Sequence, residues 1–130
     1  MPRISSFMIP ADDLDRAVRF YREVFAWRFE AGQVPGGSRY WNAQTGESAE
    51  PGIDGVVLPR EFPGQPIGVS LEVASVDEYV GRVARNGGKI LVGKAAIPGV
   101  CWFAVCQDPE GNTFILMQPD ESARLSAGPP

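Results

Sequence analysis

The sequence contains no histidine among its 130 residues. Histidine is the commonest transition-metal ligand in proteins and the usual general base near neutral pH. Its absence excludes the Ser-His and Cys-His nucleophile pairs and every metal centre that is built on imidazole. The usual residue for both roles is thus missing, and no cofactor is predicted.

A long apolar segment and a block of basic residues are also missing. The longest uncharged stretch covers residues 95–107, contains Pro98-Gly99, and is far shorter than the roughly 20 residues of a membrane-spanning helix. The formal net charge of −4 argues against nucleic acid as a partner, because binding to phosphates requires a basic stripe. The first residues do not resemble a signal peptide. We expect a cytoplasmic protein that binds neither membranes nor nucleic acids.

Cysteine is scarce, and the two that occur, Cys101 and Cys106, lie in one apolar segment. Five residues apart on a strand, they would point to opposite faces and lie too far apart to form a disulfide. We expect two small buried thiols.

The first half of the chain has the apolar spacing of a strand followed by a helix. A strand is predicted over residues 4–10, and Asp12-Asp13 provides an N-cap for the next element. Apolar residues then recur every three or four positions from Leu14 to Phe25, as on one face of a helix. Strands are predicted over 27–30, 39–43 and 54–58, with a turn at Pro35-Gly36-Gly37.

The same order restarts after a Pro- and Gly-containing connector at residues 61–66. A strand over 68–73 precedes Ser75 and Glu78, which have the spacing of a capping box. The helix ends at Asn86-Gly87-Gly88. Strands follow over 89–92, 100–107 and 112–118, the last two joined by a hairpin turn at 108–111, and residues 120–130 form a Ser-, Ala- and Pro-rich tail.

Superimposing the halves with an offset of 62 matches the order of elements and the phase of the apolar residues. Asp13 falls on Ser75, Val18 on Val80, and both halves give strand, helix, strand, strand, strand. The sequence predicts an α+β fold of two tandem β-α-β-β-β modules, over about residues 3–60 and 67–119, within a single domain spanning residues 1–119.

Four separate motifs, spread over residues 4–118, resemble the vicinal oxygen chelate superfamily, which includes glyoxalases, bleomycin resistance proteins, fosfomycin-modifying enzymes and extradiol dioxygenases. They are Asp13-Leu14-Asp15-Arg16-Ala17 with Phe20-Tyr21, the segment 73–77, Asn86-Gly87-Gly88, and Asp108-Pro109-Glu110-Gly111-Asn112 with Phe114. The resemblance implies two modules whose mixed sheet curls around a shared cleft that dimerisation usually completes. We therefore expect a homodimer.

The resemblance also implies where metal-dependent relatives hold their ligands. Those positions fall here on Ser6, Gly68 and Ile115, and the fourth falls near Val56. A hydroxyl, a bare backbone and two aliphatic side chains do not form a first shell for Zn²⁺, Ni²⁺ or Fe²⁺. The resemblance thus implies a member of the superfamily without the metal ligands.

Strand alternation from these positions predicts which side chains line the cleft. Met8, Thr113 and Met117 share a face with Ser6 and Ile115, and Ser70 and Glu72 share a face with Gly68. Glu72 is the candidate general base, since a carboxylate among Met and Ile side chains can have a raised pKa. The alternative is a structural glutamate at the rim, paired for instance with Arg39, and Asp54 is a weak second carboxylate.

Two aromatic pairs, Tyr40-Trp41 and Trp102-Phe103, lie on strands that are predicted to flank the cleft. Their rings would suit a flat apolar ligand. Alternation places one member of each pair under a helix and leaves open which one.

Two functions follow from different classes. The first is a metal-free protein that binds a small, partly apolar molecule, like the bleomycin resistance proteins; the acidic balance would suit a cationic ligand. The second is a metal-independent lyase or isomerase with Glu72 as general base. A domain kept for assembly with another protein is a third possibility without direct support.

Overall fold

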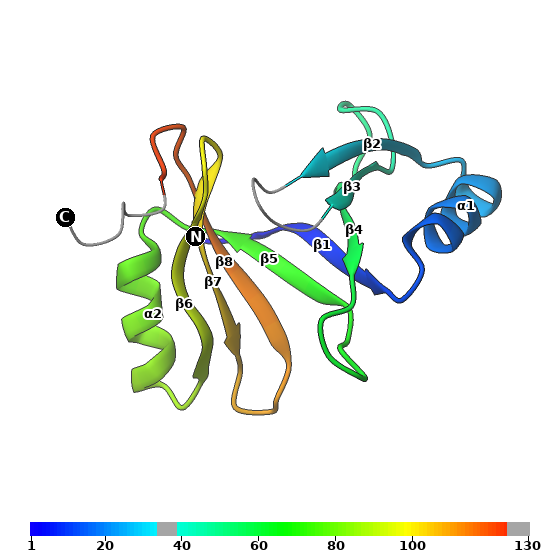
Figure 1. Ribbon diagram of the computed structural model, residues 1–130. Coiled ribbons are helices and arrows are strands. Elements are labelled where there is room, and N and C mark those ends of the chain that lie inside the picture. Colours follow the sequence, from blue (N-terminus) through cyan, green and yellow to red (C-terminus); the bar gives the residue numbers. More distant parts are fainter. Residues whose placement is uncertain (34–38, 125–130) are drawn as a thin grey trace. The chain divides into compact units, whose positions relative to one another are not determined.

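The computed structural model describes residues 1–33 and 39–124, and it consists of two compact units (Figure 1). One, here the N-terminal unit, covers Ser5–Gly68; the other, here the C-terminal unit, covers Val69–Pro130 together with Met1–Ile4. The predicted turn at residues 35–37 and residues 125–130 of the predicted tail lie outside the described residues.

The N-terminal unit contains a four-stranded mixed sheet in which the first and last strands of the module are parallel neighbours. Its elements are β1 (Ile4–Ala11), α1 (Leu14–Phe25), β2 (Arg28–Gln33), β3 (Arg39–Gln44) and β4 (Gly55–Pro59). The strand order is β2-β3-β4-β1, in which β1 and β4 are parallel and the other neighbours are antiparallel.

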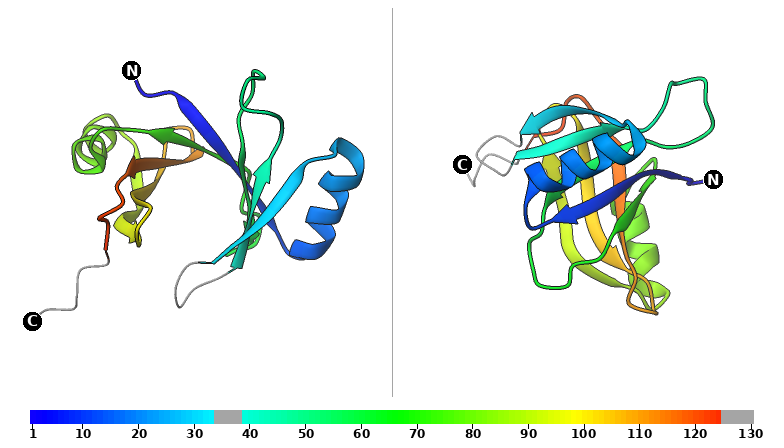
Figure 2. Two further views of the ribbon diagram at one scale, coloured as in Figure 1. Left: turned by 90° about the horizontal axis from the view of Figure 1, so that it is seen from above. Right: turned by 90° about the vertical axis from the view of Figure 1, so that its right-hand side faces the viewer.

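Helix α1 covers one face of this sheet, beside β2 and β4 (Figure 2). Asp13 caps the helix by accepting a hydrogen bond from the Arg16 backbone N–H at 3.0 Å, which satisfies a donor that the helix leaves unpaired. The Tyr21 ring of α1 stacks on Trp27 with centroids 4.9 Å apart. Val57 and Ala43 are buried in the sheet below.

The C-terminal unit has the same order of elements. They are β5 (Gly68–Glu72), α2 (Val76–Arg85), β6 (Lys89–Ile97), β7 (Cys101–Gln107) and β8 (Thr113–Pro119). The strand order is β6-β7-β8-β5, with β5 and β8 parallel and the other pairs antiparallel. Strand β6 continues five residues beyond the predicted end at Val92, because two register shifts in its ladder carry it past Gly93.

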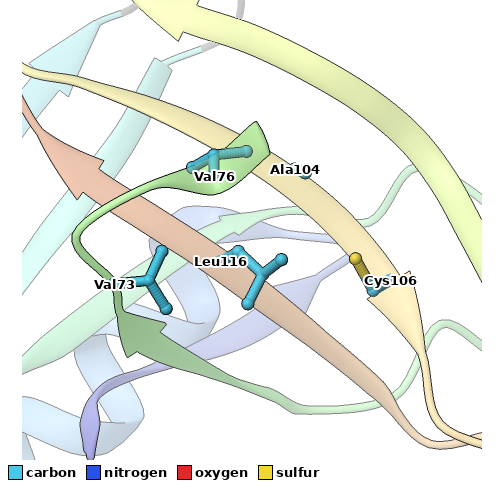
Figure 3. Packing of buried hydrophobic residues seen from close by; sticks show 5 residues of the cluster. All are labelled: Val73, Val76, Ala104, Cys106 and Leu116. Carbon is cyan, nitrogen blue, oxygen red and sulfur yellow. The ribbon is translucent and has the colours of Figure 1, made fainter. Parts of the chain in front are cut away.

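Helix α2 packs against β6, β7 and β8 over a continuous apolar core. Its cap confirms the predicted capping role of Ser75, whose side chain accepts from the Glu78 backbone N–H at 3.1 Å. The Gln118 side chain of β8 accepts a second bond from the Val76 backbone N–H at 2.9 Å. The core cluster consists of Val73, Val76, Ala104, Cys106 and Leu116 (Figure 3).

The two units confirm the predicted repeat and the α+β fold class. The N-caps Asp13 and Ser75 are 62 positions apart, which is the offset that the sequence indicates. Both units pair their first and last strands in parallel. The predicted limits of the domain and of its modules stay predictions.

The two cysteines are free and fully buried, as predicted. Cys106 lies under α2, whereas Cys101 starts β7 and belongs to the opposite face of that strand. Burial raises the pKa of both thiols, because it disfavours the charged thiolate. Both side chains therefore behave as small apolar groups.

Neither helix within the described ranges is long and apolar enough to cross a membrane.

Candidate functional site

Each four-stranded sheet carries its helix on one face, and we call the opposite face of each sheet its open face. Paired residues of neighbouring strands point to the same side, so the strand registers identify the side chains of each open face. In the C-terminal unit these include Ser70 and Glu72 of β5, Phe103 and Val105 of β7, Thr113, Ile115 and Met117 of β8, and Val92 and Ala95 of β6. In the N-terminal unit they are Ser6, Met8 and Pro10 of β1, Arg28, Glu30 and Gly32 of β2, Tyr40, Asn42 and Gln44 of β3, and Val56 and Leu58 of β4.

The open face of the C-terminal unit groups Glu72 with apolar side chains. Glu72 is paired with Met117, and Met117 is paired with Phe103 on the next strand. One row away, Ser70 is paired with Ile115, and both are buried. Glu72 itself is exposed at the end of β5. The predicted same-face grouping of these residues is therefore present, while a catalytic role for Glu72 stays a prediction.

The registers decide which member of each aromatic pair lies on an open face. Trp102 packs against the core cluster under α2, so its neighbour Phe103 points to the open face. Trp41 is paired with the fully buried Val57 on the helix face, so Tyr40 points to the open face. The two tryptophans thus lie on the helix faces of their sheets, and contact of any of these four rings with a ligand stays a prediction.

The position of the Tyr40 ring is fixed by Gly32, which lies opposite Tyr40 on β2. The two residues are cross-strand partners, and a Cβ added at Gly32 would overlap the Tyr40 ring. Covering a strand glycine with a cross-strand aromatic ring both fills the gap and fixes the ring. The ring therefore lies flat on β2, at the edge of the open face.

Trp102 is held on the helix side by polar contacts with two residues, Asp120 and Lys94. Its Nε1 donates to Asp120 at 3.0 Å, and the Lys94 ammonium lies 4.7 Å from its ring centroid. Lys94 also pairs with Asp77 of α2 at 2.8 Å. Hydrogen bonds from Ser122 first, and then from Trp102, lower the pKa of Asp120. This network stabilises the unit and takes no part in the open face.

The four positions to which the resemblance assigns metal ligands lie on strands of the two units. Ser6 and Val56 lie on the open face of the N-terminal unit, and Gly68 and Ile115 lie on β5 and β8. Their side chains supply one hydroxyl and no imidazole, thiolate or carboxylate. Within residues 1–33 and 39–124, no three His, Cys, Asp or Glu side chains converge on a point. That the protein works without a metal stays a prediction.

Asp54 lies on the loop before β4 and is held there by Thr45. One Asp54 carboxylate oxygen accepts from the Thr45 backbone N–H at 2.8 Å and from its hydroxyl at 3.3 Å. Next to Asp54, the open face of β2 and β3 presents polar side chains that are not among the residues predicted from the sequence. These residues are Arg28, Glu30, Asn42 and Gln44. Alternation on the two strands was the only signal that could have indicated them.

Known proteins resemble this chain in sequence over most of its length. A family model described as the glyoxalase-like domain matches residues 6–117. A glyoxylase-like domain-containing protein of Didymella fabae is 32% identical over 119 residues, which cover 88% of this chain and 91% of that protein. Protein CFP32 of Mycobacterium bovis, whose name assigns it provisionally to the glyoxylases, is 29% identical over 113 residues. That match covers 83% of this chain but only 41% of the mycobacterial protein, so the chain spans less than half of that relative's length.

Solved structures share the fold at lower identity. A methylmalonyl-CoA epimerase in complex with methylmalonyl-CoA and NH4+ superimposes with a TM-score of 0.69 at 19% identity, over 95% of this chain and 99% of the other. The methylmalonyl-CoA epimerase of Mycobacterium tuberculosis gives a TM-score of 0.66 at 17% identity, over 90% of this chain and 87% of the other. These structures show that the chain has their fold, and the family model and the relative from Didymella fabae show that it belongs to the family of proteins with a glyoxalase-like domain.

Proposed function

We propose that this protein binds a small, partly apolar molecule on the open faces of its sheets and that binding requires no metal ion. The observation that carries the proposal is the composition of the open face in the C-terminal unit. Phe103, Val105 and Met117 are half-buried apolar side chains around the buried Ile115, and the exposed Glu72 places a carboxylate beside them. Apolar walls with a few placed polar groups are typical of small-molecule sites.

The unsuitable side chains at the four ligand positions support the metal-free part of the proposal. A binding protein needs only shape and polarity at these positions, whereas a metal enzyme needs basic nitrogen, sulfur or oxygen ligands. The family and the fold agree with a small-molecule site, since one structural neighbour holds a CoA ester. The proposal includes a homodimer as the working form, which sedimentation of the purified protein tests.

Binding is tested with the fluorescent probe 8-anilinonaphthalene-1-sulfonate, added to metal-analysed protein with and without EDTA. We expect saturable binding that EDTA leaves unchanged and that Phe103→Ala weakens several-fold, because the ring is the largest apolar group of its open face. Phe62→Ala is the matched control, since Phe62 is 50% exposed on the loop after β4. A stoichiometric transition metal whose removal abolishes binding would contradict the proposal, as would equal effects of the two variants.

A second function, a metal-independent isomerase or lyase, is favoured by the position of Glu72 beside Met117 on the open face. The Glu72 carboxylate would take a proton from a carbon next to a carbonyl group and return it as the carboxylic acid. Methylmalonyl-CoA in D2O is a suitable probe, because exchange at C2 is visible by NMR. Exchange that Glu72→Gln abolishes and the exposed control Glu110→Gln preserves would support this function; no exchange with the wild-type protein would remove it.

A further inference from the structure

A polar trough crosses β2, β3 and β4 on the open face of the N-terminal unit. Its floor is the backbone of three paired residues, Phe29, Ala43 and Gly55, and the side chains of Phe29 and Ala43 belong to the helix face. One wall is formed by Arg28, Gln44 and Asp54, and the other by Glu30 and Asn42. The trough encloses about 440 Å³, which lies within the range of sites for small organic molecules.

Opposite charges face each other across one end of this trough. Arg28 and Glu30 are two residues apart on β2, so their Cα atoms are separated by roughly 7 Å along the strand and both side chains point to the same face. Arg28 pairs with Glu47 at 3.5 Å, but the two side chains are 73% and 65% exposed, and such a pair contributes little to stability. A ligand carboxylate can therefore replace Glu47 at the guanidinium group.

Glu30 and Asn42 are cross-strand partners on the other wall. Neither side chain makes a hydrogen bond or an ion pair with another residue of the described ranges. The opposite wall is more rigid, since Thr45 fixes Asp54 and the Gln44 amide donates to the Gly46 carbonyl at 3.2 Å. The Glu30 carboxylate and the Asn42 carboxamide are thus available to a ligand, whereas Gln44 and Asp54 on the other wall are already held by hydrogen bonds.

The polar wall continues into apolar side chains along the same row of the sheet. Asn42 is paired with Val56, and Val56 is paired with Met8, so charge gives way to an aliphatic surface within two strands. Both apolar side chains are half-buried. A ligand with a charged end in the trough would therefore have its apolar end over these two residues.

We propose that the trough binds an α-amino acid with an apolar side chain. Its carboxylate pairs with Arg28, its ammonium group pairs with Glu30, and its side chain covers Val56 and Met8. A phosphate-bearing ligand fits poorly, because Glu30 and Asp54 place two carboxylates against one guanidinium group. A simple amine would leave Arg28 without a role. The inference rests on the proposed function and names the class of ligand for the N-terminal unit.

Leucine and two analogues provide the test, with binding followed by amide chemical shifts of the isotope-labelled full chain. L-Leucine carries both charged groups, isocaproate lacks the ammonium group, and isoamylamine lacks the carboxylate. We expect each analogue to bind at least about tenfold more weakly than leucine, because each loses a charge-assisted hydrogen bond. Leucine binding equal to that of both analogues, or no leucine binding, would overturn the assignment.

Variants assign each charge to its partner. Arg28→Gln should weaken leucine binding about tenfold and leave isoamylamine unaffected, and Glu30→Gln should weaken leucine and leave isocaproate unaffected. Glu47→Gln should preserve or tighten leucine binding, because it removes the competitor for Arg28. The exposed controls Arg85→Gln and Glu110→Gln should change nothing. If Arg28→Gln weakened isoamylamine binding as much as leucine binding, or Glu30→Gln weakened isocaproate binding as much as leucine binding, the proposed pairing would be contradicted.

The same sample separates this inference from the proposed function. If the naphthalene probe binds and responds to Phe103→Ala while leucine does not bind, the amino-acid assignment is wrong and the proposed function stands. If neither compound binds, both are wrong.

Discussion

The two units share one topology but stabilise their helices differently. In the C-terminal unit, α2 covers a continuous cluster that includes the fully buried Val76 and Cys106. In the N-terminal unit, α1 buries Val18 and relies on the stacking of Tyr21 against Trp27. Three large apolar side chains of α1 remain more than half exposed, namely Phe20, Val24 and Phe25.

The open faces of the two units also differ, in the chemistry of their side chains. The C-terminal unit presents mainly apolar side chains beside Glu72, whereas the N-terminal unit presents charged and amide side chains beside Tyr40. Topology fixes which positions share a face, because strand pairing and alternation are the same in both units. The residues at those positions then decide the chemistry. A repeated fold thus gives one mainly apolar surface and one on which charged and amide side chains adjoin an aliphatic part.

The largest expected difference between the two units is in their cores. Leu116 is 3% exposed in the α2 cluster, so Leu116→Ala should lower the free energy of unfolding by about 3 kcal/mol through a lost apolar group and a cavity. Phe20→Ala on α1 should cost less than about 1 kcal/mol, since the ring is 55% exposed. Urea unfolding followed by circular dichroism measures both. Equal costs would show that another molecule or segment covers α1.

Close packing in the N-terminal unit can be tested at a glycine. A Cβ at Gly55 would lie 2.5 Å from the Phe7 ring and its carbonyl oxygen, and a backbone atom cannot move aside cheaply. Gly55→Ala should therefore destabilise the protein by about 2 kcal/mol. The matched control is Gly93→Ala on β6, where no atom lies within 4 Å, and its effect should be near zero or slightly stabilising. A lower urea midpoint for the control than for Gly55→Ala would contradict the packing at β4.

The smallest effect concerns acid stability and is expected in the C-terminal unit. Backbone and side-chain hydrogen bonds from Asn112 lower the pKa of Asp108, and hydrogen bonds from Ser122 lower the pKa of Asp120. A carboxyl group with a lowered pKa stabilises the folded state when it is ionised, so this stabilisation is complete above its unfolded pKa of about 4 and is lost as the pH falls below it.

Replacing both groups should remove part of that pH dependence. The double variant Asp108→Asn/Asp120→Asn should be less stable than the wild type at pH 7, and its stability should fall less between about pH 4 and pH 2. Urea unfolding at several pH values measures the slope. An unchanged slope in the double variant would refute the role of these turns.

Much of the fold could be predicted from local signals. The caps at Asp13 and Ser75, the apolar phase of both helices and the turn at residues 108–111 depend on neighbouring residues, so a sequence displays them directly. Strand β6 was predicted too short, because a bulged strand loses the alternation on which the prediction relies. The trough was missed because its walls come from β2, β3 and the loop before β4, and no single segment shows it.

The sequence by itself determined the repeat of two β-α-β-β-β modules, the absence of imidazole and the buried state of both thiols, because composition and periodicity are properties of the chain. Only the tertiary structure decided that Tyr40 and Phe103 lie on open faces and that Trp41 and Trp102 support helices. Alternation yields two equivalent faces for every strand. Which face a helix covers depends on how it packs on the sheet, and that packing is set by contacts between residues far apart in the sequence.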